Sequence, residues 1–113
     1  MALIKTKIQI FNHDSTAFGP GKALLLVAIL NHGSISAAAK NMKMSYRRAW
    51  DLVTAMNDSF KEPLVITKTG GSHGGGAEVT VLGRHVLSTY LDALKKSECF
   101  IDAQMSDLLK LLK

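Results

Sequence analysis

The sequence predicts an α+β fold that is mainly α, and three observations lead to this prediction. Residues 20–60 carry apolar side chains at helical spacing, in runs short enough for three helices. Two β-prone runs, 64–69 and 77–81, flank a segment with five glycines in seven positions, which is typical of a β-hairpin. From Leu82 onward apolar residues recur every three or four positions, so a long C-terminal helix is expected.

Composition fits one folded domain. The 113 residues are 47% hydrophobic and 20% charged, enough for one core but not for two. Cys99 is the only cysteine, which excludes an intrachain disulfide and suits a reducing compartment, so a cytoplasmic protein is expected. The N-terminus lacks a signal-peptide pattern and no window of about 18 apolar residues occurs, so no membrane partner is expected.

The first third of the chain should contain a strand, a loop and a helix. Residues 3–11 alternate in polarity, which predicts an N-terminal strand whose half-buried face carries Ile4, Thr6, Ile8 and Ile10. Residues 12–21 are expected to be a loop. A helix over about 21–32 should bury Leu24, Leu25, Val27, Ala28 and Ile29, and Gly33 is a natural left-handed stop for it.

Residues 33–57 should form two short helices joined by a tight turn, roughly 36–42 and 45–60. Ser36 can cap the first helix and Ser45 the second, because a hydroxyl accepts free N–H groups of a first helical turn. Small alanines allow the two helices to cross closely, as in a helix-turn-helix. The first turn of the second helix carries Tyr46, Arg47 and Arg48. A recognition helix contacts DNA with this turn.

Positive charge concentrates on the same segment. The formal net charge is +5, which favours a polyanionic partner, and nine consecutive residues without an acid hold Lys40, Lys43, Arg47 and Arg48. A solvated charged face is the alternative explanation. Tyr46 and Trp50 share a helix face; packing at the edge of the core is an alternative for both and is favoured for Trp50.

A hairpin directly after a recognition helix is the wing of a winged helix-turn-helix, so the sequence predicts this fold with a Gly-rich wing. Side chains and glycine N–H groups of the hairpin can reach phosphates or a minor groove. A linker without DNA contacts is the alternative. The predicted DNA-binding residues are Ser34, Ser36, Lys43, Ser45, Tyr46, Arg47, Arg48, Lys68, Ser72 and His73.

The C-terminal helix is expected to mediate dimerisation. A helix of some 30 residues spans about 45 Å, longer than so small a domain covers by itself. Its seam steps by four and three and is apolar apart from Glu98, which predicts a two-fold homodimer through Leu87, Leu91, Leu94, Ile101, Met105, Leu108 and Leu112. A fold-back around residues 95–99 is the alternative. We therefore divide the chain into a winged helix-turn-helix DNA-binding domain, 1–81, and a dimerisation helix, 82–113.

Several segments resemble the N-terminal DNA-binding domain of the molybdate-responsive (ModE-type) transcriptional regulators, winged helix-turn-helix proteins distantly related to the LysR type. The matches include Phe-Gly-Pro-Gly-Lys at 18–22, Gly-Ser-Ile-Ser-Ala-Ala-Ala-Lys at 33–40 and Met-Ser-Tyr-Arg-Arg-Ala-Trp-Asp at 44–51, and continue to about residue 95. The resemblance implies a DNA-binding dimer with residues 45–48 on the recognition helix and 68–76 in the wing. Molybdate-sensing members continue into oxyanion-binding domains, for which a chain of this length is expected to lack room, so no cofactor is expected.

These features predict a sequence-specific transcriptional regulator that binds, as a homodimer, a near-palindromic duplex with half-sites about 34 Å apart. The alternative is a protein–protein adaptor with only non-specific DNA affinity. An enzyme is not expected, because Gly21-Lys22 lacks the remaining residues of a phosphate-binding loop. No metal site is expected either, because metal-ligand spacing is missing among His13, His32, His73 and His85.

Overall fold

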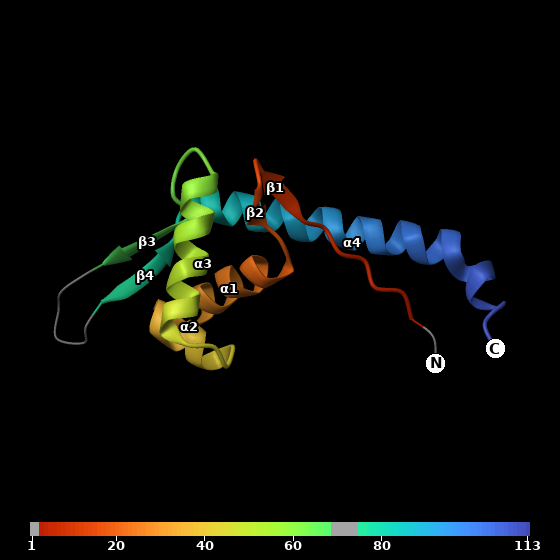
Figure 1. The fold of residues 1–113 in the computed structure, drawn as a ribbon, viewed down its shortest axis with the longest axis horizontal. Coiled ribbons are helices and arrows are strands. Elements are labelled where there is room, and N and C mark those ends of the chain that lie inside the picture. Colours follow the sequence, from red (N-terminus) through yellow and green to blue (C-terminus); the bar gives the residue numbers. More distant parts are fainter. Residues whose placement is uncertain (1–2, 69–74) are drawn as a thin grey trace.

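The computed structural model describes residues 3–68 and 75–113 (Figure 1). In chain order the elements are β1 (Ile10–Asn12), β2 (Ser15–Phe18), α1 (Pro20–His32), α2 (Ile35–Asn41), α3 (Tyr46–Ser59), β3 (Val65–Lys68), β4 (Gly76–Val79) and α4 (Val81–Leu109). In this part of the chain β1 pairs with β2 and β3 with β4, each pair antiparallel. The predicted mainly helical winged helix-turn-helix is confirmed.

The core lies where α1, α2 and α3 meet the base of the β3–β4 hairpin. Small side chains occupy the crossing of the helices, and Ala38 and Ala49 are fully buried there, as the alanine-rich sequence predicted. The largest fully buried side chains are Phe18, Leu25, Leu26, Ile29, Met56, Leu64 and Val65. Phe18 makes edge-to-face contacts with the rings of Phe60 and Tyr90, which brings the end of α3 and the first third of α4 against β2.

Helix α1 is buried over most of its circumference, and one prediction about it was wrong. Leu24, expected to be mostly buried, is 61% exposed, whereas its neighbours Ala23 and Leu25 are buried. The helix carries apolar residues on every side, so their spacing does not reveal which side faces solvent. Gly33 ends α1 with φ 76°, as predicted, and its N–H donates to the carbonyl of Ile29.

A buried lysine joins α1 to the strand before it. Lys22 is only 8% exposed, and its Nζ donates to the carbonyl of Thr16 on β2. Burial away from water lowers the pKa of this ammonium group. The hydrogen bond compensates part of that desolvation, so β2 is held over the first turn of α1.

Of the two N-cap residues predicted for the helix-turn-helix, one is confirmed and the other was wrong. Ser45 caps α3, because its Oγ accepts a hydrogen bond of 3.0 Å from the backbone N–H of Arg48, as predicted. The prediction that Ser36 caps α2 was wrong, because α2 starts one residue earlier, at Ile35. Ser34 is the cap instead, and its Oγ accepts from the N–H of Ala37 at 3.0 Å.

The N-terminal segment keeps the predicted alternation but pairs as a strand only at its end. Half-burial does alternate over Ile4, Thr6 and Ile8, but Ile10, which was expected on the same face, is 45% exposed. However, β1 begins at Ile10, and its partner is β2, which lies in the segment predicted to be a loop. The alternation arises because the segment lies along α4, where Tyr90 Oη donates to the carbonyl of Ile8 at 2.8 Å. A helix, not a second strand, covers this face.

Helix α4 is continuous from Val81 to Leu109, so the alternative fold-back at residues 95–99 was wrong. Thr80 caps it by accepting from the N–H of Gly83 at 3.0 Å. Its buried residues, Gly83, Leu87 and Tyr90, all belong to the first third of the helix. The rest extends away from the domain beside the N-terminal segment, and gives a longest extent of 59 Å (Figure 1).

Among the described residues, no helix taken singly has the length and apolar content that a membrane crossing requires. Helices α1 and α2 meet that length and apolar content only when they are taken together, and they are bent by 117° at their junction. Both helices supply residues to the core of the domain.

Candidate nucleic-acid interface

The turn between α2 and α3 fixes how α3 is presented. Lys43 adopts φ 58°, and its N–H donates to the carbonyl of Lys40 at 3.1 Å, while that of Met44 donates to Ala39 at 3.0 Å. One face of α3 is then buried through Ala49, Val53 and Met56. Because these three positions face the core, the remaining faces of the first turn of α3 are directed toward solvent.

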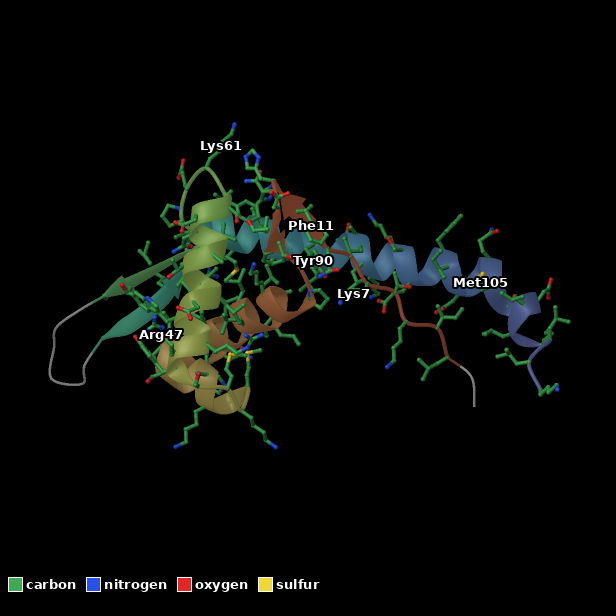
Figure 2. All side chains as sticks on the ribbon, viewed as in Figure 1. Lys7, Phe11, Arg47, Lys61, Tyr90 and Met105 are labelled. Carbon is green, nitrogen blue, oxygen red and sulfur yellow. The ribbon has the colours of Figure 1, made fainter. Side chains whose placement is uncertain are left out.

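Arg47 and Arg48 are both exposed on that first turn. The Arg47 side chain is 86% exposed, and its Nε lies 3.3 Å from Oδ1 of Asp51, one helical turn later. Exposed pairs of this kind contribute only about 0.3–0.5 kcal/mol, so the guanidinium can exchange this partner for another anion. Figure 2 shows Arg47 near the end of α3 that lies beside α2, while Lys61 lies beyond the opposite end.

Further exposed cations lie on the elements next to these arginines. Lys40 in α2 and Lys43 in the turn are exposed, so four cations, Lys40, Lys43, Arg47 and Arg48, lie on the α2–α3 unit. Lys68 on β3 is also exposed, and its Nζ lies 2.9 Å from Oε2 of Glu78 across the hairpin. The hydrogen bond and charge of Lys68 lower the pKa of the Glu78 carboxyl.

Asn57 attaches the hairpin to the end of α3. Its Nδ2 donates to the carbonyl of Val65 at 2.9 Å, and its Oδ1 accepts from the N–H groups of Leu64 at 2.9 Å and Val65 at 3.2 Å. This side chain satisfies three backbone groups where β3 begins. The sequence did not reveal this role, because the partners are set by the meeting of two elements and not by any local pattern.

Two further hydrogen bonds and one close backbone approach hold the hairpin in place. The N–H of Ala77 on β4 donates at 2.9 Å to the carbonyl of Gly33, at the corner between α1 and α2. Thr80 Oγ1 donates to the carbonyl of Pro63 at 2.8 Å. Gly83 lies so close to the same segment that an added Cβ would stand 2.3 Å from the carbonyl oxygen of Leu64. The stem of the hairpin is therefore fixed to α1, α3 and α4.

A groove of about 340 Å³ separates α3 from the hairpin stem. Its polar walls come from the start of α2 and from β3, and two aromatic rings of α3 line it as well. Tyr46 and Trp50 are 52% and 40% exposed, and their rings stack with centroids 6.2 Å apart and planes inclined by 20°. The residues that supply its side chains include Ser34, Ser36, Tyr46, Trp50, Thr67 and Lys68.

The structure brings most of the predicted DNA-binding residues to one side of the molecule. Ser34, Ser36, Tyr46 and Lys68 line the groove, and Arg47 and Arg48 follow Tyr46 on α3. The Oγ atoms of Ser34 and Ser45 accept capping hydrogen bonds, so their hydroxyl protons are still available as donors. Ser72 and His73 lie outside the described residues.

The predicted dimerisation residues differ in exposure along α4. Leu87 is 6% exposed and packs in the domain's own core, which leaves it little surface for a partner helix. Leu94, Ile101 and Met105 are half-buried, and the exposed members of the set are Leu91, Leu108 and Leu112. Leu112 lies beyond the last residue of the helix, Leu109.

The comparison with protein families agrees with this geometry. Residues 22–84 match the family described as "Bacterial regulatory helix-turn-helix protein, lysR family". The chain belongs to this family. The matched range begins within α1 and ends in the first turn of α4, so it contains the complete α2–α3 unit and the strands of the hairpin.

Individual relatives specify the type of regulator. The chain is 43% identical over 75 residues to "Molybdenum transport protein ModE" of Azotobacter vinelandii, covering 66% of this chain and 28% of the relative. It is 42% identical over 79 residues to "Transcriptional regulator ModE" of Haemophilus influenzae, covering 70% and 31%. It is 41% identical over 71 residues to "DNA-binding transcriptional dual regulator ModE" of Escherichia coli K12, covering 63% and 27%.

The predicted resemblance is therefore confirmed, and the chain contains a ModE-type DNA-binding helix-turn-helix domain. Duplex DNA is the partner that such a domain implies. The chain spans about a third or less of the length of these three curated relatives, 27% to 31%. The shared region is the DNA-binding part.

Proposed function

We propose that this chain is a sequence-specific transcriptional regulator that binds a near-palindromic operator as a homodimer. The observation that carries the proposal is the first turn of α3, where Tyr46, Arg47 and Arg48 stand exposed beside a buried Ala49. A recognition helix uses this turn to reach base edges in the major groove. Arginine suits that task, because its guanidinium pairs bidentately with O6 and N7 of guanine.

The remaining cations are suited to the phosphates. Lys40 and Lys43 flank the end of α2, from which they can contact the backbone on either side of the groove that α3 enters. Lys68 extends the basic surface to the hairpin, and its exposed pairing with Glu78 is weak enough to be shared with a phosphate. These contacts supply affinity and salt dependence, whereas the two arginines supply sequence preference.

The dimer is supported by the outer part of α4. A helix of 29 residues is about 44 Å long, and beyond Tyr90 it contributes no buried residue among those described. Apolar side chains remain open there and beside the N-terminal segment, where Ile8, Ile10 and Val86 line a cavity of about 260 Å³. Figure 2 labels Met105, which is half-buried, on this outer part of the helix. A second copy of the helix covers such a seam with two-fold symmetry and places two recognition helices on successive turns of DNA.

Selection of duplexes from a random pool, followed by mobility shifts with the selected site, tests the proposal. Arg47→Ala should weaken specific binding by about 1–3 kcal/mol and relax preference at one base step. Lys61→Ala is the matched control, because it removes one exposed cation at the far end of α3 and should preserve selectivity. Full affinity and selectivity in Arg47→Ala would refute the assignment of Arg47.

The same titrations distinguish a regulator from a protein–protein adaptor. A regulator should bind the selected duplex at least about a thousandfold more tightly than random duplex at physiological salt. An adaptor with incidental DNA affinity would bind both alike. Repeating the selection with molybdate present shows whether this oxyanion, which gives the ModE-type regulators their description, affects the chain.

A further inference from the structure

We propose that the stacked pair Tyr46–Trp50 is a contact platform for the sugar–phosphate backbone of one DNA strand, seated in the groove between α3 and the β3–β4 hairpin. The proposal rests on the DNA binding proposed above and adds Trp50 to the residues that make it. The sequence favoured Trp50 as a packing residue at the edge of the core. The structure gives this ring a different environment.

The exposure and orientation of the two rings support a role in binding. Trp50 is 40% exposed and lies one helical turn after Tyr46, which is 52% exposed. The face of α3 that packs in the core is the one carrying Ala49, Val53 and Met56, all at most 4% exposed. Two large rings stacked against each other on a water-facing surface form a rigid apolar platform. Covering this platform with a partner is favourable, because apolar surface is removed from water.

The walls of the groove combine polar and apolar groups, as the phosphates and sugars of a DNA backbone do. Hydroxyl groups of Ser34, Ser36 and Thr67 and the ammonium group of Lys68 are donors that suit phosphate oxygens. The flat faces of Tyr46 and Trp50 suit the apolar faces of deoxyribose. The groove therefore offers hydrogen-bond donors and apolar surface side by side, over a volume of about 340 Å³.

The position of the groove indicates the same occupant. When α3 lies in a major groove and the hairpin reaches toward the adjacent minor groove, the strand between these grooves must pass between α3 and the hairpin stem. Arg47 and Arg48 follow Tyr46 in the first turn of α3 and are exposed, so the surface next to the platform is cationic. This charge complements a polyanion. The carboxylate of Glu78 on the stem is paired with Lys68.

Trp50 is the only tryptophan of the chain, so its fluorescence reports on this groove alone. The experiment measures acrylamide quenching of the unmodified protein, free and saturated with its selected duplex. The quenching constant should fall about twofold or more when DNA covers the ring, because access from water is then lost. The same measurement over rising protein concentration without DNA is the control. Protection that appears there would assign the groove to a second copy and overturn the proposal.

Affinity measurements provide the second test. Trp50→Ala should weaken binding to the selected duplex about tenfold, whereas Trp50→Phe, which keeps a flat ring, should weaken it about threefold or less. Phe11→Ala is the matched control, since it removes a 61% exposed aromatic ring from β1, away from the groove, and should leave affinity unchanged.

The outcomes separate the two proposals. If no duplex is bound selectively, the proposed function fails. If the protein binds a selected duplex in an Arg47-dependent manner, but acrylamide still reaches Trp50 and Trp50→Ala binds like the unmodified protein, the platform alone is refuted. The quenching test needs no substitution, so a poorly folded Trp50→Ala variant does not prevent a decision.

Discussion

The two ends of α4 share one unbroken backbone but have very different surroundings. At the start of the helix, Gly83, Leu87 and Tyr90 are buried in the core of the domain. After Tyr90 every described residue is half-buried or exposed. Two large apolar side chains on this outer part, Phe100 and Leu108, are more than half exposed, and so are Leu111 and Leu112 just beyond the end of the helix. The first part is a structural component of the winged domain, whereas the outer part gains its stability mainly from the helix itself and from what covers it.

This difference separates stability from assembly. Substitutions at the inner end should act on the free energy of unfolding of the domain, because they disturb packed contacts. Substitutions at the outer end should act on association between copies and leave the domain folded. Four predictions are given in order of decreasing effect on the unfolding free energy: three in α4 test this separation, and one at Asn57 in α3 tests the attachment of the hairpin that packs against the start of α4.

Gly83→Ala should have the largest effect. The added Cβ would lie 2.3 Å from the carbonyl oxygen of Leu64 and 2.7 Å from Cγ1 of Val79, so backbone must move, at a cost of about 3 kcal/mol. Urea unfolding measures this loss. Gly21→Ala is the control: an added Cβ meets nothing within 4 Å there, so a gain of up to about 1 kcal/mol is expected from helix propensity. Equal stability of the two variants would contradict the close packing of α4 on the hairpin.

Asn57→Ala should lower the unfolding free energy by about 2 kcal/mol, because three backbone groups of β3 lose their partner. Urea unfolding again gives the value. Asn57→Asp keeps the acceptor and loses the donor, so its effect should be about half as large. If both variants unfold like the unmodified protein, the hairpin is not held by this side chain.

Tyr90→Phe should cost about 1 kcal/mol at neutral pH, because its hydroxyl donates to Ile8 at 2.8 Å. Burial raises the pKa of Tyr90 above the ordinary 10.0, so the unfolded chain ionises first. Stability from this group is therefore complete below pH 10 and is lost as pH rises through the higher pKa of the folded state. Thermal melts of both proteins across that range should converge. Parallel pH profiles of the two proteins would show that Tyr90 is not responsible for the loss of stability at high pH. Tyr46→Phe is the control, because its ring is exposed and the variant should melt like the unmodified protein.

Leu108→Lys should have the smallest effect on the domain, within about 0.5 kcal/mol, because the side chain is 51% exposed. It should nevertheless shift dimers to monomers in sedimentation equilibrium, since a charge would enter the apolar seam. Ala103→Lys adds the same charge on the opposite side of α4 and should leave the dimer intact. Unfolding of the Leu108→Lys monomer at 25 °C would show that the two ends of α4 are not independent.

Local patterns identified most of the fold. The spacing of apolar residues located three helices and the long α4, glycines located the hairpin, and Gly33 ended α1 as predicted. The errors occurred where a residue's partner lies far along the chain. Alternation over Ile4–Ile8 does reflect one covered face, but sequence cannot tell whether a strand or a helix covers it. Likewise the continuous apolar run 23–30 of α1 gave no indication that Leu24 faces water.

The candidate site was predictable to a similar extent. The cationic turn of α3 was recognisable, because charge and helix position are both local properties. The role of Asn57 and the groove beside Trp50 were not, since both depend on how the hairpin meets α3. A ring near a helix crossing is equally compatible with burial and with exposure until the position of the neighbouring element is known.

The bond from Ala77 to Gly33 has a consequence for the energetics of association. It joins the start of β4 to the corner from which α2 departs, while Asn57 joins β3 to α3. The stem and the two crossed helices are thereby preorganised as one rigid body. A duplex that meets them all at once need not immobilise them separately, so less of its interaction free energy is spent on conformational entropy. Tight docking can then be achieved by a small contact area.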